Sequence, residues 1–183
     1  FLKRLVDTYS LEHNLAMYTL LGSHDVERVR TMLEGDTQRV KLASLIQFAF
    51  LGAPAIYYGD EIGLEGGKDP GCRGGFPWDS QYWDTDLRAW FQHLARTRKQ
   101  SHALRRGDFQ VLLANDDQHA VAFARRASQE SVAVVMNASA LPRSIKLPVD
   151  QLGWADGYRA KNLLGADGYT IQRGELQILL PAW

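Results

Sequence analysis

The sequence has a single cysteine and no excess of charge of either sign, and these two absences exclude several kinds of protein. Because Cys72 is the only cysteine among 183 residues, an internal disulfide and a cysteine-rich metal site are excluded, while the cellular compartment stays open. The 21 lysines and arginines balance 21 aspartates and glutamates, and no basic run offers a surface for phosphates. We therefore expect no nucleic-acid partner.

Long hydrophobic runs are also missing. No apolar stretch approaches the roughly 20 residues that span a membrane, so we expect no membrane partner. With 183 residues, 45% of them hydrophobic, the chain can bury a core, and its length allows one or two domains. The sequence begins at Phe1 rather than at Met, which leads us to expect a piece of a longer protein.

The first part of the sequence has the spacing of alternating helices and strands. Residues 15–21 (LAMYTLL) and 55–59 (AIYYG) are predicted to be buried strands. Between them, Asp36 is the expected N-cap of an amphipathic helix, and a further helix is predicted over 87–104. Strand, helix and strand in this order predict a parallel βαβ unit.

From Phe109 onward the hydrophobic period becomes two, which is typical of antiparallel strands. Six short segments show it, namely VLLAND, AVAFARR, SVAVVMN, SIKLPV, YRAKNLL and LQILLPAW. Turn residues such as Asp156-Gly157 separate them. We predict an antiparallel β-sandwich, in which residues 133–136, apolar on both faces, form a central strand.

The stretch LLGSHDVERV, residues 20–29, places an imidazole beside a carboxylate where a predicted strand ends. Taken alone, His24 and Asp25 are better explained by hydrogen bonds to the backbone of a helix end or a loop than by a catalytic role. A second motif, GAPAIYYGDEIGLEGGKDPGCRGGFPWD at residues 52–79, follows in the same order that a known family shows. The two motifs together favour the functional interpretation.

These two motifs resemble those of the α-amylase family of glycoside hydrolases, and GGKDPGCR resembles its neopullulanase, cyclomaltodextrinase and maltogenic amylase branch. The resemblance implies an α/β fold followed by an all-β fold. Residues 1–106 would be the last two βα units of a (β/α)8 TIM barrel, and residues 107–183 a C-terminal antiparallel β-sandwich domain.

The resemblance also implies a function. The full-length parent would be a retaining hydrolase of α-1,4 or α-1,6 glucosidic bonds, with an α-glucan or maltooligosaccharide substrate and no cofactor or metal. Active sites of such barrels lie at the carboxyl ends of the strands. There Asp25 would stabilise the transition state and His24 would contact the same sugar. Asp69 and Arg73 would contact sugars on the non-reducing side, although a purely loop-structuring role is equally open for them.

The carboxylates that break the bond are not identified in this sequence. Retaining glycosidases need two carboxyl groups roughly 5 to 5.5 Å apart. In this family they come from earlier barrel strands, the nucleophile within a G-x-R-x-D pattern, which the sequence lacks. We therefore predict that the 183-residue chain is inactive by itself. Because two strands cannot close a barrel, we also expect either self-association through residues 1–60 or a rearrangement of that region.

Several other side chains near the motifs have more ordinary interpretations. Adjacent acids diverge at a strand end, so Glu61, after Asp60, is predicted to bond to backbone or to an arginine. Arg28 either pairs with a carboxylate or is solvated. Tyr57 and Tyr58 should alternate between the faces of a strand, so at most one should face the site.

The aromatic residues leave two further questions open. Trp90 belongs to a helical apolar stripe and is predicted to lie in the core, whereas Trp78, in a loop, either stacks on a sugar or packs locally. A non-catalytic carbohydrate-binding or docking module would instead gather aromatics in the sandwich loops. Those of the second half, Trp154, Tyr158, Tyr169 and Trp183, form no cluster in the sequence. A transglycosylase or isomerase of the same family is the other alternative.

Overall fold

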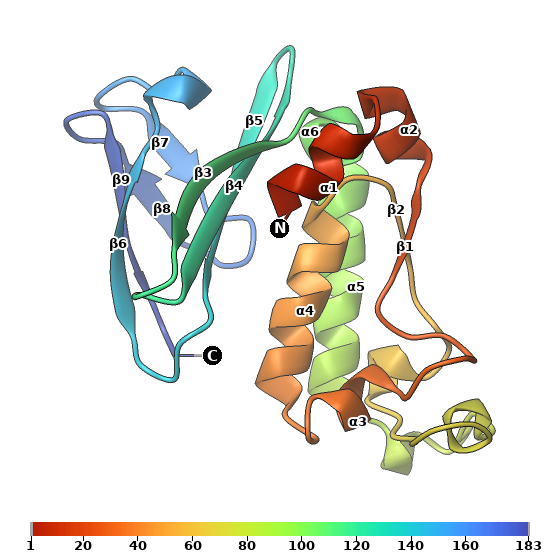
Figure 1. Ribbon diagram of the computed structural model, residues 1–183. Coiled ribbons are helices and arrows are strands. Elements are labelled where there is room, and N and C mark those ends of the chain that lie inside the picture. The colour runs from red at the N-terminus through yellow and green to blue at the C-terminus, as the bar shows by residue number, and fades with distance from the viewer. Residues whose placement is uncertain (1, 183) are drawn as a thin grey trace. The chain divides into compact units, whose positions relative to one another are not determined.

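A computed structural model describes residues 2–182, so Phe1 and Trp183 lie outside the described residues. The chain forms two compact units. The first, which we call the central unit, is Glu12–Gln100. The second, the sheet unit, combines the residues up to Leu11 with the chain from Ser101 onward. Figure 1 labels the helices and strands of both.

The central unit contains the predicted βαβ arrangement. Its elements are α2 (Leu11–Ala16), β1 (Tyr18–Leu20), α3 (Val29–Met32), α4 (Thr37–Ala49), β2 (Ala53–Ala55) and α5 (Thr85–Gln100). Strands β1 and β2 lie side by side (Figure 1) and pair in parallel, with Tyr18 opposite Ala53 and Leu20 opposite Ala55. The prediction of a parallel βαβ unit is confirmed.

Both strands are shorter and more exposed than the sequence predicts. Residues 15–16 belong to α2 instead of β1, and residues 56–59 follow β2 instead of forming it. Tyr18 is 72% exposed and Leu20 44% exposed, so β1 is not the buried strand that its apolar sequence predicts. The physical reason is that β1 and β2 pair only with each other among the described residues, which leaves apolar side chains without a covering layer.

Helix α4 begins where the sequence predicts. The Asp36 carboxylate accepts hydrogen bonds from the backbone N–H groups of Gln38 (2.8 Å) and Arg39 (3.1 Å), as an N-cap does. Helices α4 and α5 run side by side (Figure 1). The core of this unit consists of Val29, Val40, Phe48, Leu87, Phe91 and Leu94.

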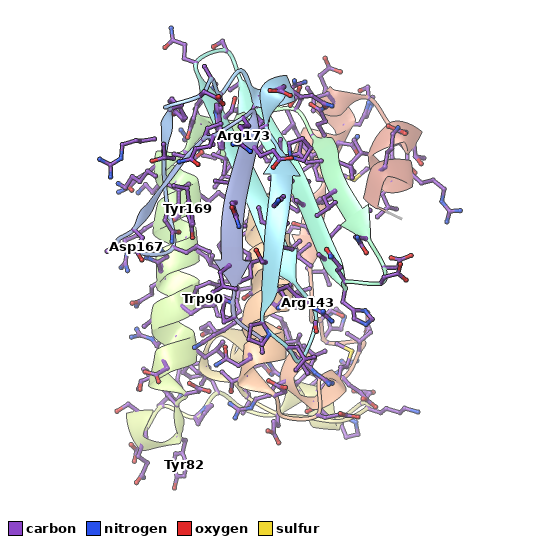
Figure 2. The ribbon with its side chains drawn as sticks, turned by 90° about the vertical axis from the view of Figure 1, so that its left-hand side faces the viewer. Tyr82, Trp90, Arg143, Asp167, Tyr169 and Arg173 are labelled. Atoms are coloured by element: carbon purple, nitrogen blue, oxygen red, sulfur yellow. The ribbon has the colours of Figure 1, made fainter. Side chains whose placement is uncertain are left out.

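Trp90 lies on α5 and packs against this core, as predicted (Figure 2). Its indole Nε1 donates to the Ser44 hydroxyl of α4 over 3.0 Å. The hydrogen bond satisfies the one polar group of a ring that otherwise contributes apolar surface, so the indole fixes α5 against α4.

One side chain from α5 holds the turn between α4 and β2. The guanidinium of Arg98 is buried, and its Nη1 donates to the carbonyl oxygens of Phe48 (2.6 Å) and Phe50 (3.1 Å). Its Nη2 donates to the carbonyl oxygen of Gly52. These carbonyls lie at or beyond the end of α4, where intrahelical partners run out and a positive charge is favourable. Arg98 therefore fixes the position at which β2 begins.

The sheet unit is antiparallel, as predicted. It comprises α1 (Leu2–Thr8), α6 (His102–Arg106), β3 (Gln110–Asn115), β4 (Ala120–Ala127), β5 (Glu130–Asn137), β6 (Arg143–Pro148), β7 (Arg159–Lys161), β8 (Gly168–Thr170) and β9 (Glu175–Leu180). The sheets are β3-β4-β5, β6-β9 and β7-β8 (Figure 1). Their common core consists of Ala122, Ala124, Leu147, Val149, Leu152, Ile171 and Leu176.

Two details of this unit differ from the sequence predictions. Strand β5 is an edge strand and β4 is the central one, so the expectation for residues 133–136 is wrong. These residues are apolar on both faces because α6 contacts β5, while Ala133 and Val135 pack on the sandwich core. The predicted helix 87–104 is divided at Ser101, whose hydroxyl accepts from the Leu104 N–H (3.1 Å) and caps α6.

Within residues 2–182, no helix combines the length and the apolar composition needed to cross a membrane.

Candidate functional site

The loops that follow β1 and β2 bring together the four side chains that the sequence singles out. Because the two strands are parallel, both loops leave from the same edge of the sheet. His24 Nε2 lies 3.2 Å from Asp25 Oδ1, and Arg73 Nη2 lies 3.7 Å from the same oxygen. Arg73 Nε lies 2.7 Å from Asp69 Oδ1. We call His24, Asp25, Asp69 and Arg73 the polar cluster.

The polar cluster is open to solvent. The side chains of His24 and Asp25 are 61% and 70% exposed, and those of Asp69 and Arg73 are 58% and 50% exposed. The cluster offers two carboxylates as hydrogen-bond acceptors, a guanidinium as a donor, and an imidazole that can donate or accept. This set can form several hydrogen bonds to neighbouring hydroxyl groups of one ligand.

The loop that carries Arg73 is held by hydrogen bonds that the sequence does not predict. The Cys72 sulfur is fully buried and donates to the carbonyl oxygen of His24 over 3.2 Å. The Tyr57 hydroxyl donates to the carbonyl oxygen of Cys72 (3.4 Å), and the Tyr58 hydroxyl to that of Gly74 (2.9 Å). Neither partner could be found from the sequence, since both are backbone atoms.

Arg28 explains why the two tyrosines lie on the same side. Its guanidinium carbon lies 4.3 Å from the centre of the Tyr57 ring and 4.5 Å from that of Tyr58. The expectation that these rings alternate between faces is wrong, because both residues lie beyond β2. The side chain of Arg28 is fully buried, and its Nη1 also donates to the carbonyl oxygen of Tyr58.

Asp60 answers the question that the sequence left open for Arg28. Its Oδ1 lies 3.5 Å from Arg28 Nη1, and both side chains are buried. Burial raises the pKa of the Asp60 carboxyl from 3.8 to about 6; Glu61 contributes in the same direction, and the Arg28 guanidinium opposes both. The neighbouring Glu61 has the structural role predicted for it, since its Oε2 accepts from the Gly59 N–H over 2.8 Å.

Asp84 is a carboxylate of the same unit with the opposite electrostatic balance. Burial raises its pKa. Hydrogen bonds from the Leu87 N–H (2.9 Å) and the Thr37 hydroxyl (3.1 Å), together with the charge of Arg30, lower the pKa by more than burial raises it. The net result is a pKa below the ordinary value of an aspartate. Asp84 and Asp60 therefore respond to acid in opposite ways.

Trp78 is 85% exposed in the loop that follows Arg73. Its ring centre lies 5.0 Å from that of Phe76, and the Phe76 ring lies 5.8 Å from that of Trp83. The indole is accessible to a ligand, and the interpretation of Trp78 as a sugar contact stays a prediction.

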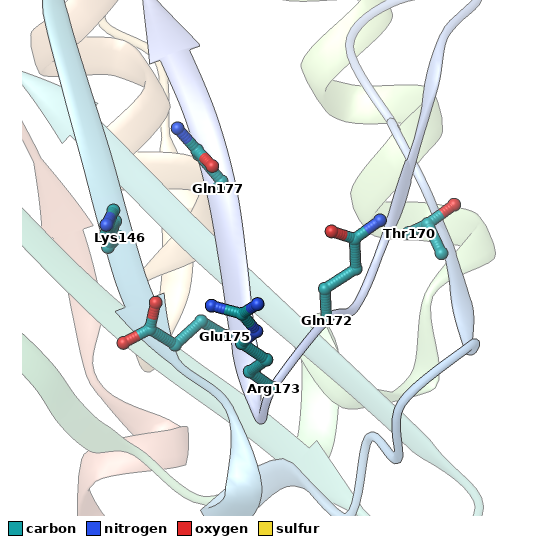
Figure 3. A pocket seen from close by; sticks show the side chains of 6 residues that line it. All are labelled: Lys146, Thr170, Gln172, Arg173, Glu175 and Gln177. Atoms are coloured by element: carbon teal, nitrogen blue, oxygen red, sulfur yellow. The ribbon is translucent and has the colours of Figure 1, made fainter.

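A hollow of about 310 Å³ lies in the sheet unit, between β6, β8 and β9 (Figure 3). Its lining side chains are Lys146, Thr170, Gln172, Arg173, Glu175 and Gln177. They supply hydrogen-bonding groups, but none of the six is aromatic, so the hollow has no ring on which a sugar could stack. Because it contains none of the residues in the two sequence motifs, we place the candidate site at the polar cluster.

Among residues 2–182, no group of three or more histidine, cysteine, aspartate or glutamate side chains is arranged to hold a metal ion.

Two protein-family models match the sequence. Residues 2–119 match the α-amylase catalytic domain, and residues 109–182 match the neopullulanase-like C-terminal domain. A cyclomaltodextrinase of Geobacillus thermopakistaniensis is 37% identical over the whole chain, and neopullulanase 2 of Thermoactinomyces vulgaris is 34% identical over 83% of it. The chain spans only 30% and 26% of the lengths of these two relatives.

Solved structures give the same result. A cyclomaltodextrinase superposes on 98% of the chain with a TM-score of 0.87 and 35% identity. A debranching enzyme of Nostoc punctiforme superposes on 98% of it with a TM-score of 0.83 and 33% identity. The chain covers 30% and 35% of these two structures. The similarity therefore includes both units, within proteins that are about three times longer.

The pKa of Asp60 predicts an unusual pH dependence of stability. Because the folded chain holds the Asp60 proton more tightly than the unfolded chain, this group stabilises the fold fully below pH 3.8, and the contribution is lost as the pH rises through about 6. Its size is about 3 kcal/mol at most. Asp60→Asn should remove this fall, which urea unfolding of both proteins between about pH 4 and 7 would measure.

Asp84→Asn is the matched control, since its lowered pKa gives the opposite sign: stability is lost as the pH falls. A difference between the wild type and Asp60→Asn that does not change with pH would contradict the prediction.

Proposed function

Because this chain belongs to the α-amylase family of glycoside hydrolases, we propose that it is the C-terminal part of an enzyme that hydrolyses α-1,4 or α-1,6 glucosidic bonds in α-glucans. The observation that carries the proposal is the meeting of His24, Asp25, Asp69 and Arg73, with Arg73 3.7 Å from Asp25, beyond the carboxyl ends of two adjacent parallel strands. The names of the relatives, cyclomaltodextrinase, neopullulanase and amylopullulanase, support this class of substrate.

The roles of the four residues follow from the charge that develops during glycoside cleavage. An oxocarbenium-like transition state gains from hydrogen bonds to sugar hydroxyls that strengthen as positive charge appears on the ring. Asp25 is the carboxylate that stabilises this state, and His24 donates to a hydroxyl of the same sugar. Asp69 and Arg73, which form an ion pair of 2.7 Å, bind a sugar farther from the bond that breaks.

The nucleophile and the acid/base come from parts of the parent enzyme outside this chain. We also propose a domain boundary at residues 106 and 107. It is supported by the C-terminal family match, which begins at residue 109, while the compact units divide at Ser101, before α6. No cofactor takes part in this chemistry.

The 183-residue chain should not hydrolyse pullulan, starch or cyclodextrins. In the full-length parent, Asp25→Asn should lower kcat by about 10² or more, because a contact made in the transition state is lost. Steady-state kinetics measures this, and Glu27→Gln, in the same loop, is the matched control. Turnover by the purified chain that disappears with Asp25→Asn would contradict the assignment of the other catalytic groups to missing strands.

Alanine at Asp69 or Arg73 should impair long α-glucans more than short chromogenic glucosides. Remote sugars contribute binding energy that short substrates cannot use. The measurement is the ratio of kcat/KM for the two substrates in the full-length parent, with Lys68→Ala as the control in the same loop. Equal losses on both substrates would show that the two residues only structure the loop.

The chain by itself should self-associate through residues 1–60. Strands β1 and β2 each have one unpaired edge among the described residues, and Tyr18 and Leu20 are exposed there. Light scattering over a range of concentrations measures the mass, and Leu20→Lys should shift the equilibrium towards the monomer. Leu179→Lys, at a residue that is 71% exposed on β9, is the control. A wild type that is monomeric at all concentrations would refute this prediction.

A further inference from the structure

Asp60 contacts both ends of the segment that carries His24 and Asp25. This segment, residues 22–28, starts at Gly22, where an added Cβ would lie 2.4 Å from Asp60 Oδ2. It ends at Arg28, whose Nη1 lies 3.5 Å from Asp60 Oδ1. One buried carboxylate thus limits the position of the segment at its first and its last residue.

The partner of Asp60 in this interaction is the buried guanidinium of Arg28. A guanidinium stays charged at any pH that a protein tolerates, so a buried arginine requires a partner of opposite charge. Arg28 has Asp60 as that partner, with the rings of Tyr57 and Tyr58 within 4.5 Å of its guanidinium carbon. Its backbone N–H donates to the carbonyl oxygen of Gly66 over 2.9 Å. Arg28 therefore joins the 22–28 segment to the chain that follows β2.

We propose that Asp60 and Arg28 are positioning residues, which hold the 22–28 segment at both ends and thereby set where Asp25 lies relative to Arg73. Neither is catalytic, because their side chains are 4% and 0% exposed and cannot touch a sugar. The inference rests on the proposed function only where it concerns activity. The arrangement itself is a property of the chain.

Cys72 gives a direct readout of this arrangement. It is the only thiol in the sequence, it is fully buried, and its sulfur donates to the carbonyl oxygen of His24 within the 22–28 segment. If the segment moves away, the thiol becomes accessible to a reagent such as DTNB. The rate of this reaction at a fixed pH thus measures how often the segment opens.

The experiment compares five variants of the 183-residue chain with the wild type. Above about pH 7, where Asp60 is ionised, Asp60→Asn and Arg28→Met should each raise the labelling rate of Cys72 by about tenfold or more, because each removes the ion pair that joins the two side chains. Gly22→Ala, which changes no charge, should do the same, since its Cβ would displace Asp60. Arg30→Met should leave the rate unchanged, because Arg30 bonds to Glu65 and Asp84 instead.

A conservative replacement of Arg28 tests whether its charge and its stacking on the tyrosines both contribute. Arg28→Lys keeps the charge but loses the planar stacking on the tyrosines, so its rate should lie between those of the wild type and Arg28→Met. Wild-type rates for Asp60→Asn, Arg28→Met and Gly22→Ala would overturn the proposal. So would faster labelling that accompanies a loss of helical circular dichroism in all three, because the pair would then stabilise the whole unit.

Activity provides the second arm. In the full-length parent, Asp60→Asn should lower kcat at least about tenfold with KM changed less, because the misplaced group acts in the transition state. If Asp25→Asn leaves kcat unchanged, the proposed function fails, while the labelling of Cys72 still decides whether the pair positions the segment. If only the labelling is unaffected, the positioning role fails and the function stands.

Discussion

The burial of one guanidinium, that of Arg28, is the constraint on which the arrangement of the site depends. A charge that cannot be neutralised by losing its proton must find a carboxylate, and here it finds Asp60, 3.5 Å away and also buried. The two tyrosines that flank the guanidinium follow β2 instead of belonging to it. Their hydroxyls donate to the carbonyl oxygens of Cys72 and Gly74. The loop after β1 and the loop after β2 are thereby held in fixed positions relative to each other.

Buried and exposed charges have separate tasks in the central unit. Burying the pair Arg28 and Asp60 costs desolvation, and this cost raises the pKa of the Asp60 carboxyl. The polar cluster is at least half exposed, so its ion pairs are weak and its groups remain available to a ligand. We thus assign the positioning of the site to buried side chains and the contact with a ligand to exposed ones.

Much of this could be predicted from the sequence, for identifiable reasons. Asp36 marked the start of α4 because an N-cap is a local signal. The family resemblance singled out His24, Asp25, Asp69 and Arg73 but did not predict that Arg73 would lie 3.7 Å from Asp25. The partner of Arg28 could not be chosen, since Asp60 lies in a different loop and competed with every other acid. The edge position of β5 was missed because cover from α6 and the sandwich core produces the same apolar pattern as a central strand. The early end of β2 goes with tertiary contacts of Tyr57 and Tyr58 that no strand pattern contains.

The bonds of Arg98 have a consequence for the order in which the chain acquires its structure during synthesis. The turn after α4 is complete only when this side chain reaches the carbonyl of Phe48, which lies 50 residues earlier in the sequence. A chain emerging from the ribosome therefore presents β2 and the loop after it before the group that fixes them has been translated. During that interval the site loops lack their final structure and can be bound by chaperones. They reach their native conformation only after α5 has left the exit tunnel.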